Sequence, residues 1–82
     1  MNAGIARLRA KIDRDLAVLI RRELQRSFAL TDRCRFSEAA DARDRAKRWL
    51  AVANLAAGER VRLERLLQTA DASASLPAAA CA

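Results

Sequence analysis

The stretch LTDRCRFS, residues 30–37, decides the fold because it separates two long segments with helical periodicity. On both sides of it, apolar residues recur at steps of three and four, a pattern that predicts amphipathic helices. Thr31 and Ser37 are both favoured as helix N-cap residues, and Glu38 places a negative charge in the first turn that would follow Ser37. The stretch therefore predicts a tight turn between two antiparallel helices.

The segment before the turn is predicted to be a helix over residues 3–30. A short first helix with a break near residues 11–14 is the alternative, because Asp13 or Asp15 could cap a fresh start. The stripe drifts around the helix axis as its steps lengthen, which suits packing against another helix. The apolar positions are Ile5, Leu8, Ile12, Leu16, Leu19, Ile20, Leu24 and Phe28.

The segment after the turn is predicted to be a helix over residues 37–57. Its stripe is rich in alanine, which allows a close helix contact, and Trp49 is favoured as a core residue at the wider end. Val52 and Leu55 lie beside this stripe, and a second apolar flank calls for a second neighbour. Gly58 is either the C′ residue that ends this helix or a tolerated glycine within a longer one, at a cost of about 1 kcal/mol relative to alanine.

A third amphipathic helix is predicted over residues 59–70, and the small, neutral residues 71–82 are predicted to be a disordered tail. No segment shows the alternation of a strand. The predicted fold is all-α: one domain, residues 1–70, made of an antiparallel helical hairpin plus a third short helix. A chain of 82 residues buries a limited core, so a partner or self-association would add to its stability.

The charge of the chain is basic and unevenly distributed. Lys and Arg number 16 against 10 Asp and Glu, a net charge of +6, and residues 1–35 hold nine of the cations against four acids. All but two of the cations are arginine, which favours bidentate pairing with carboxylates or phosphates. A GC-rich genome produces the same arginine content without selection, so the two interpretations stay open.

Several residue types that carry chemistry are absent from the chain. It has no His, the commonest general base and metal ligand, and no glycine-rich phosphate loop. Glu38, Asp41 and Asp44 interleave with basic residues at helical spacing, which indicates ion pairs. We therefore expect no enzyme activity, no catalytic residue, no cofactor, no metal and no small-molecule substrate.

The two cysteines and the apolar runs bear on the cellular compartment in which the protein is found. Cys34 and Cys81 form no disulfide framework by their spacing, which favours a reducing compartment. The N-terminal residues lack the apolar region of a signal peptide, and the longest apolar run, residues 16–20, is too short to span a bilayer. A cytoplasmic protein is expected.

The opening of the second helix carries a short motif. Phe36, Ala39, Ala40, Arg43 and Asp44 spell F-x-x-A-A-x-x-R-D. This resembles the UVR motif, a helical hairpin of bacterial excision-repair subunits and some stress-response proteins. The resemblance covers roughly residues 20–50 and implies that the hairpin serves protein–protein contact. The chain departs from the pattern at Ala42, Ala46 and Ser27, where larger residues are usual.

A second resemblance concerns the order of the helices. An amphipathic helix with LIRRELQRSF at 19–28, a turn, and a helix from Phe36 through Trp49 are similar to the small helical co-chaperones of type III secretion needle subunits. In that family a helical hairpin packs on a tetratricopeptide-repeat chaperone. The turn here is shorter, and the third helix extends past the usual end.

Both resemblances imply a small helical adaptor or co-chaperone that binds a protein partner, or itself, through an apolar helix face. The expected partner-binding residues are Leu24, Phe28, Phe36, Leu50, Val52, Leu55 and Leu63. The alternative is a small basic nucleic-acid-binding protein that contacts phosphates through the first helix. No aromatic residues interleave with these cations, and a solvated helix face explains them equally well. The cations are Arg7, Lys11, Arg14, Arg21, Arg22 and Arg26.

Overall fold

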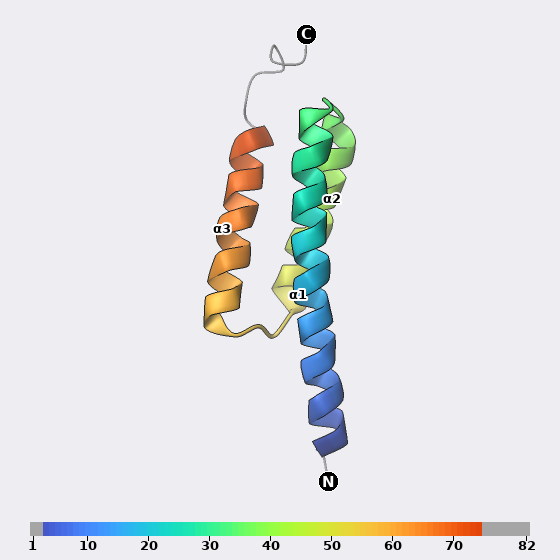
Figure 1. Ribbon diagram of the computed structural model, residues 1–82, viewed down its shortest axis with the longest axis vertical. Coiled ribbons are helices and arrows are strands. Elements are labelled where there is room, and N and C mark those ends of the chain that lie inside the picture. Colours follow the sequence, from blue (N-terminus) through green and yellow to red (C-terminus); the bar gives the residue numbers. More distant parts are fainter. Residues whose placement is uncertain (1–2, 75–82) are drawn as a thin grey trace.

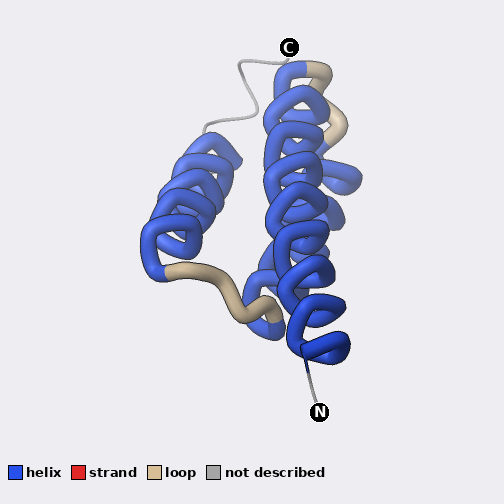
Figure 2. The backbone as a smooth tube through the Cα atoms, turned by 60° about the horizontal axis from the view of Figure 1, so that its bottom comes forward, coloured by secondary structure: helices blue, strands red, loops and turns tan. Residues whose placement is uncertain are grey.

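The computed structural model describes residues 3–74, which form three helices, α1 (Ala3–Asp32), α2 (Phe36–Val52) and α3 (Ala57–Ala74). α2 runs back along α1, and α3 runs back along α2, so α1 and α3 point the same way (Figure 1). The two connections lie at opposite ends of the bundle (Figure 2). The all-α fold predicted from the sequence is confirmed.

The helix boundaries differ from those predicted by a few residues at most ends. α1 is continuous through residues 11–14, so the alternative break does not occur. α2 ends five residues earlier than predicted, at Val52, and α3 begins at Ala57 and continues to Ala74. Residues 71–74, predicted to belong to a disordered tail, are therefore helical, and the rest of the predicted tail, residues 75–82, lies outside the described part of the chain.

The turn between α1 and α2 is a Schellman motif. The Arg35 N–H donates to the Leu30 carbonyl at 2.8 Å, and the Cys34 N–H donates to the Thr31 carbonyl at 2.9 Å. Cys34 takes the left-handed position with φ 61°, which costs a residue with a Cβ about 1–2 kcal/mol. Cys34 is also disulfide-bonded, so the expectation that the cysteines form no disulfide is wrong, and with it the argument for a reducing compartment.

The capping roles expected of Thr31 and Ser37 are wrong. Thr31 lies inside α1, where its hydroxyl donates to the Ser27 carbonyl at 2.8 Å. Ser37 lies inside the first turn of α2, whose N-cap is Arg35 and has no side-chain capping bond. Glu38 does lie in the first turn, where it forms an ion pair with Arg35 at 3.3 Å. The Schellman turn moves the start of α2 earlier than the serine suggested.

α2 ends because Ala53 adopts an extended conformation, with φ −74° and ψ 136°. The segment after it is held from both sides. The Arg60 guanidinium donates to the Ala53 carbonyl at 2.6 Å, and the Asn54 N–H donates to the Asp13 carboxylate at 3.3 Å. Gly58 lies in the first turn of α3 without a positive φ, so neither predicted role for it, as a C′ residue or within a longer second helix, is correct.

Small residues dominate the contact of α1 with α2. Ser27 of α1 and Ala39, Ala42 and Ala46 of α2 are almost completely buried. Short side chains at these positions permit a small interaxial distance. The Ser27 hydroxyl donates to the Leu24 carbonyl at 2.6 Å, which removes the penalty of burying it. Larger side chains fill the rest of the core: Ile20, Leu24, Leu50 and Leu63.

The molecule is elongated, measuring 59 × 20 × 14 Å with a radius of gyration of 15.0 Å. A compact domain of this length has a radius of gyration of about 12 Å. The difference comes from α1, whose N-terminal end continues beyond the ends of α2 and α3 (Figure 1). This extension leaves the N-terminal part of α1 without a neighbouring helix.

Candidate functional site: the exposed surfaces of α1

Three of the seven expected partner-binding residues lie inside the bundle. Leu24, Leu50 and Leu63 are 0%, 6% and 1% exposed. A partner could reach them only if the helices separated, so the structure gives them a core role instead.

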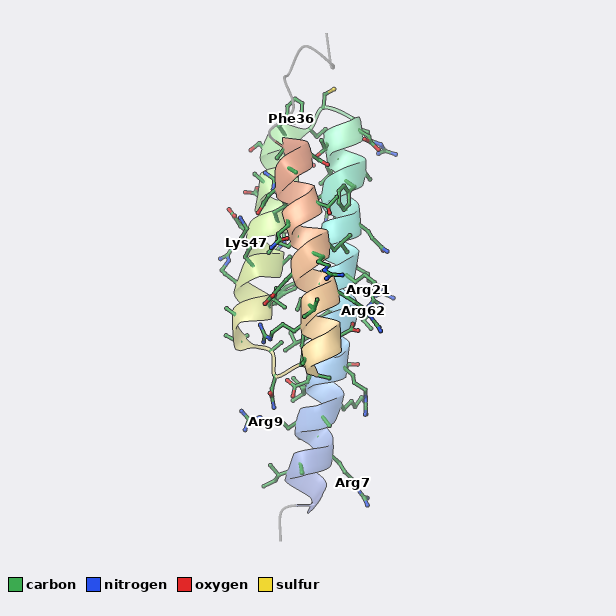
Figure 3. The ribbon with its side chains drawn as sticks, turned by 90° about the vertical axis from the view of Figure 1, so that its left-hand side faces the viewer. Arg7, Arg9, Arg21, Phe36, Lys47 and Arg62 are labelled. Carbon is green, nitrogen blue, oxygen red and sulfur yellow. The ribbon has the colours of Figure 1, made fainter. Side chains whose placement is uncertain are left out.

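The other four expected partner-binding residues are reachable from the surface. Phe28 and Leu55 are half-buried and pack against the core, as does Trp49. Phe36 is exposed beside the first turn (Figure 3), and Val52 is 75% exposed at the end of α2. The four are not gathered in one patch, since Phe36 and Val52 lie at opposite ends of α2.

An exposed apolar surface lies on the N-terminal part of α1, which contains none of the seven expected partner-binding residues. We call residues 3–12 of α1 the N-terminal arm. Ile5, Leu8 and Ile12 on this arm are 66%, 60% and 50% exposed, because neither α2 nor α3 extends beside it (Figure 1). Arg7 and Arg9 point into solvent on opposite sides of the arm (Figure 3). In the sequence, the three aliphatic residues belong to the apolar helical stripe. No local pattern indicates that neither α2 nor α3 packs against them.

One side of the seam between α1 and α2 is covered by α3. Arg21 of α1 pairs with Glu59 at 2.8 Å, and Arg43 and Lys47 of α2 pair with Asp71 at 3.4 Å. In Figure 3, α3 lies in front of the seam, with α1 and α2 on either side of it.

Within residues 3–74, no third helix covers the opposite side of the same seam. It is marked by the ion pair of Glu23 with Arg45 at 3.3 Å. Residues two apart on a helix point in nearly opposite directions, so Glu23 faces away from Arg21, and Arg45 away from Arg43. We call this side the open seam; α3 does not cover it.

Helical spacing identifies the apolar residues along the open seam. Leu19 and Leu16 lie four and seven residues before Glu23, so they follow it on the same side of α1. Trp49 and Val52 lie four and seven residues after Arg45 on the antiparallel helix. The stripe then continues past the end of α2 onto the arm. We define the arm stripe as Ile5, Leu8, Ile12, Leu16 and Leu19.

A groove lies on the other flank of α1, at the base of the bundle. It has a volume of about 570 Å³ and is bounded by α1, by the connection between α2 and α3, and by the start of α3. Leu55, expected to bind a partner, and Arg14, expected to bind phosphate, both line it. Ala10, Ala17 and Val18 give it an apolar floor, and the ion pair of Arg21 with Glu59 borders it.

The expected phosphate-binding cations are all exposed on α1. Arg21 is engaged by Glu59, which leaves it less available to a phosphate. The remaining five form no ion pair within residues 3–74, and helical spacing places them on the side of α1 that faces away from α2. They are Arg7, Lys11, Arg14, Arg22 and Arg26.

Two further features bear on what the described residues can do. Between residues 3 and 74, no three Cys, Asp or Glu side chains are grouped so that they could hold a metal ion. None of the three helices, as far as the structure describes them, combines the length and apolar content needed to cross a bilayer.

The chain was also compared with known proteins. No protein-family model, curated protein or solved structure matches it. Function is therefore inferred from the geometry of the residues above, in which a partly uncovered helix presents an apolar stripe on one flank and a groove on another.

Proposed function

We propose that this chain is a small helical adaptor or co-chaperone that binds an amphipathic helix of another protein molecule along the N-terminal arm. The observation that carries the proposal is the exposure of Ile5, Leu8 and Ile12, which are at least half exposed on a helix that extends past its neighbours. Their spacing of three and four residues is the one by which helices recognise each other.

The energetics favour covering this surface. Full burial of one large aliphatic side chain contributes about 1.5–3 kcal/mol relative to exposure, so a helix laid over three half-exposed ones gains several kcal/mol. The arm also needs the support, because a short helical segment without tertiary packing is marginally stable in water. A partner helix would supply both. The proposed role is binding, without catalysis.

Affinity capture from the native host tests the proposal with a matched pair of variants. In Leu8→Asp, a charge enters the arm surface, and captured protein should fall at least about tenfold, corresponding to 1.4 kcal/mol or more. In Val61→Asp, the same change is made on α3 at a residue that is 44% exposed, and capture should be unchanged. Equal capture by both variants would contradict binding through the arm.

The second candidate is a nucleic-acid-binding protein, favoured by the five cations of α1 that form no ion pair within residues 3–74. Titration of duplex DNA and single-stranded RNA at two salt concentrations tests it. Five phosphate contacts would give a slope of log affinity against log salt of about −4 to −5 on duplex DNA. Arg22→Gln with Arg26→Gln should reduce that slope, whereas Leu8→Asp should leave it unchanged. Absence of binding at low salt would remove this candidate.

A further inference from the structure

The arm stripe has a symmetry that identifies its partner. Ile12 lies at its centre, Leu8 and Leu16 lie four residues to either side, and Ile5 and Leu19 lie seven residues to either side. The spacing therefore reads the same in both directions along α1. A surface of this kind is complementary to itself under a twofold rotation.

We propose that the helix bound by the arm is α1 of a second copy of this chain, paired antiparallel about a twofold axis at Ile12. This inference rests on the proposed function and names its partner. In the pair, Ile12 faces its own counterpart. Leu8 lies opposite Leu16 of the second copy, and Ile5 lies opposite Leu19 of the second copy.

The charges beside the stripe fit the antiparallel direction. Arg9 and Lys11 precede Ile12, whereas Asp13 and Asp15 follow it. An antiparallel pair brings the basic positions of one copy beside the acidic positions of the other, on both flanks of the stripe. A parallel pair would place like charges side by side, which is unfavourable.

The oppositely charged residues also lie on matching sides of the arm stripe in the two copies. At 100° per residue, Arg9 and Asp13 flank the stripe on one side, and Lys11 and Asp15 flank it on the other. A twofold axis across the contact keeps each side facing the same side of the second copy. Arg9 therefore meets Asp13 of the second copy, and Lys11 meets Asp15 of the second copy. Each pair is offset along the helices by two residues, about 3 Å, which these side chains span.

The bundle leaves room for this pairing. By the antiparallel register of Glu23 with Arg45, Val52 at the end of α2 lies at the level of Leu16, four residues short of Ile12. Both copies of α2 therefore stop before the twofold axis. The arm of the second copy extends along the open seam, where it would bury the exposed side chains of Leu19 and Val52.

Sedimentation equilibrium of the full chain tests the pairing. The wild-type protein should sediment as a dimer of the 9.0 kDa chain at micromolar concentration. Ile12→Asp sets two carboxylates against each other at the axis and should raise the dimer dissociation constant by at least about 100-fold. Val61→Asp, with the same change on α3, should leave it within about twofold, because the surface it alters lies outside the contact.

A charge experiment tests the direction of the pairing. Lys11→Asp and Asp15→Lys should each weaken their own homodimer, by about tenfold, since each sets like charges on one flank. Mixing the two variants should restore dimerisation, because the introduced carboxylate of the first chain then meets the introduced ammonium of the second. At the symmetry-related position on the same flank, the unchanged Lys11 of the second chain meets the unchanged Asp15 of the first. A parallel pair would be weakened by neither single change.

The outcomes separate this inference from the proposed function. A wild-type chain that stays monomeric at about 100 μM, well above the dissociation constants of stable dimers, would overturn the pairing. So would a dimer that survives Ile12→Asp. If either result came with Leu8-dependent capture of a different host protein, the adaptor function would stand with another partner. If no such capture occurred, both proposals would fall.

Discussion

The two halves of α1 are built from the same kinds of residue and meet opposite environments. Ile20 and Leu24 in the C-terminal half are 0% exposed, whereas Ile5 and Leu8 in the N-terminal half are mostly exposed. The helix is continuous between them. Burial here is therefore set by what lies beside the helix, and the apolar side chains themselves do not determine it.

The N-terminal half of α1 is not packed against α2 because α2 ends at Val52. Ala53 turns the chain out of the helix, and its carbonyl is held by Arg60 from α3. Had α2 continued to residue 57 in the same register, it would have run alongside Ile12. The short α2 leaves α1 with one packed half and one uncovered half, so matched changes in the two halves should have different effects.

Truncating a leucine in each half should give the largest contrast. Leu24→Ala leaves a cavity among Ile20, Leu50 and their neighbours, and should lower the free energy of unfolding by about 2–5 kcal/mol. Leu8→Ala removes the same atoms from an exposed site and should change it by less than about 0.5 kcal/mol in the monomer. Urea denaturation at a protein concentration that favours the monomer measures both. Similar losses would show that the arm is packed.

Enlarging an alanine should test how tightly the packed half is held. Ala42 is fully buried where α2 meets α1, so Ala42→Leu should lower the free energy of unfolding by about 1–3 kcal/mol through overpacking. Ala51 is exposed on the same helix, and Ala51→Leu should be nearly neutral. Urea denaturation of the two variants gives the comparison. A neutral Ala42→Leu would mean that the helices separate easily and that the core leucines are accessible.

The all-α fold could be predicted from local patterns in the sequence. The steps of three and four marked the apolar faces of all three helices, and the turn at residues 30–37 lies where the pattern is interrupted. The predicted N-cap is wrong because Ser37 is a good N-cap by residue type, whereas the Schellman motif uses Cys34, a residue type that rarely adopts a left-handed conformation. No local signal marks that choice.

The candidate site was harder to predict because it depends on contacts far apart in the sequence. The end of α2 is fixed by Asp13 and Arg60, neither of which is adjacent to it along the chain. With α2 predicted to reach residue 57, the arm had a neighbour. The sequence pattern therefore predicts that the apolar residues of the arm pack against α2. It also led to the expectation that Leu24, Leu50 and Leu63 bind a partner. The spacing of apolar residues predicts that a helix face is apolar, but it does not predict which element packs against that face.

Two neighbouring arginines give a smaller contrast on the packed side. Arg21 pairs with Glu59 of α3 at 2.8 Å with both side chains partly exposed, so Arg21→Gln should cost no more than about 1 kcal/mol. Arg22 makes no ion pair within residues 3–74, and Arg22→Gln should leave the free energy of unfolding unchanged. Thermal unfolding in low and high salt measures both, and only the Arg21→Gln difference should shrink in high salt.

The smallest expected effect lies in the arm. Gly4 has open space around the position of a Cβ, so Gly4→Ala should favour the helix by up to about 1 kcal/mol locally. Because neither α2 nor α3 packs beside the arm, we expect it to open separately from the core, and the free energy of global unfolding should rise by less than about 0.5 kcal/mol. Slower amide exchange at Leu8 and its neighbours should report the gain in dilute protein. At concentrations that favour the antiparallel pair, the arm is held by the second copy, and the difference between Gly4→Ala and wild type should disappear. A difference that persists at every concentration would show that the arm never pairs.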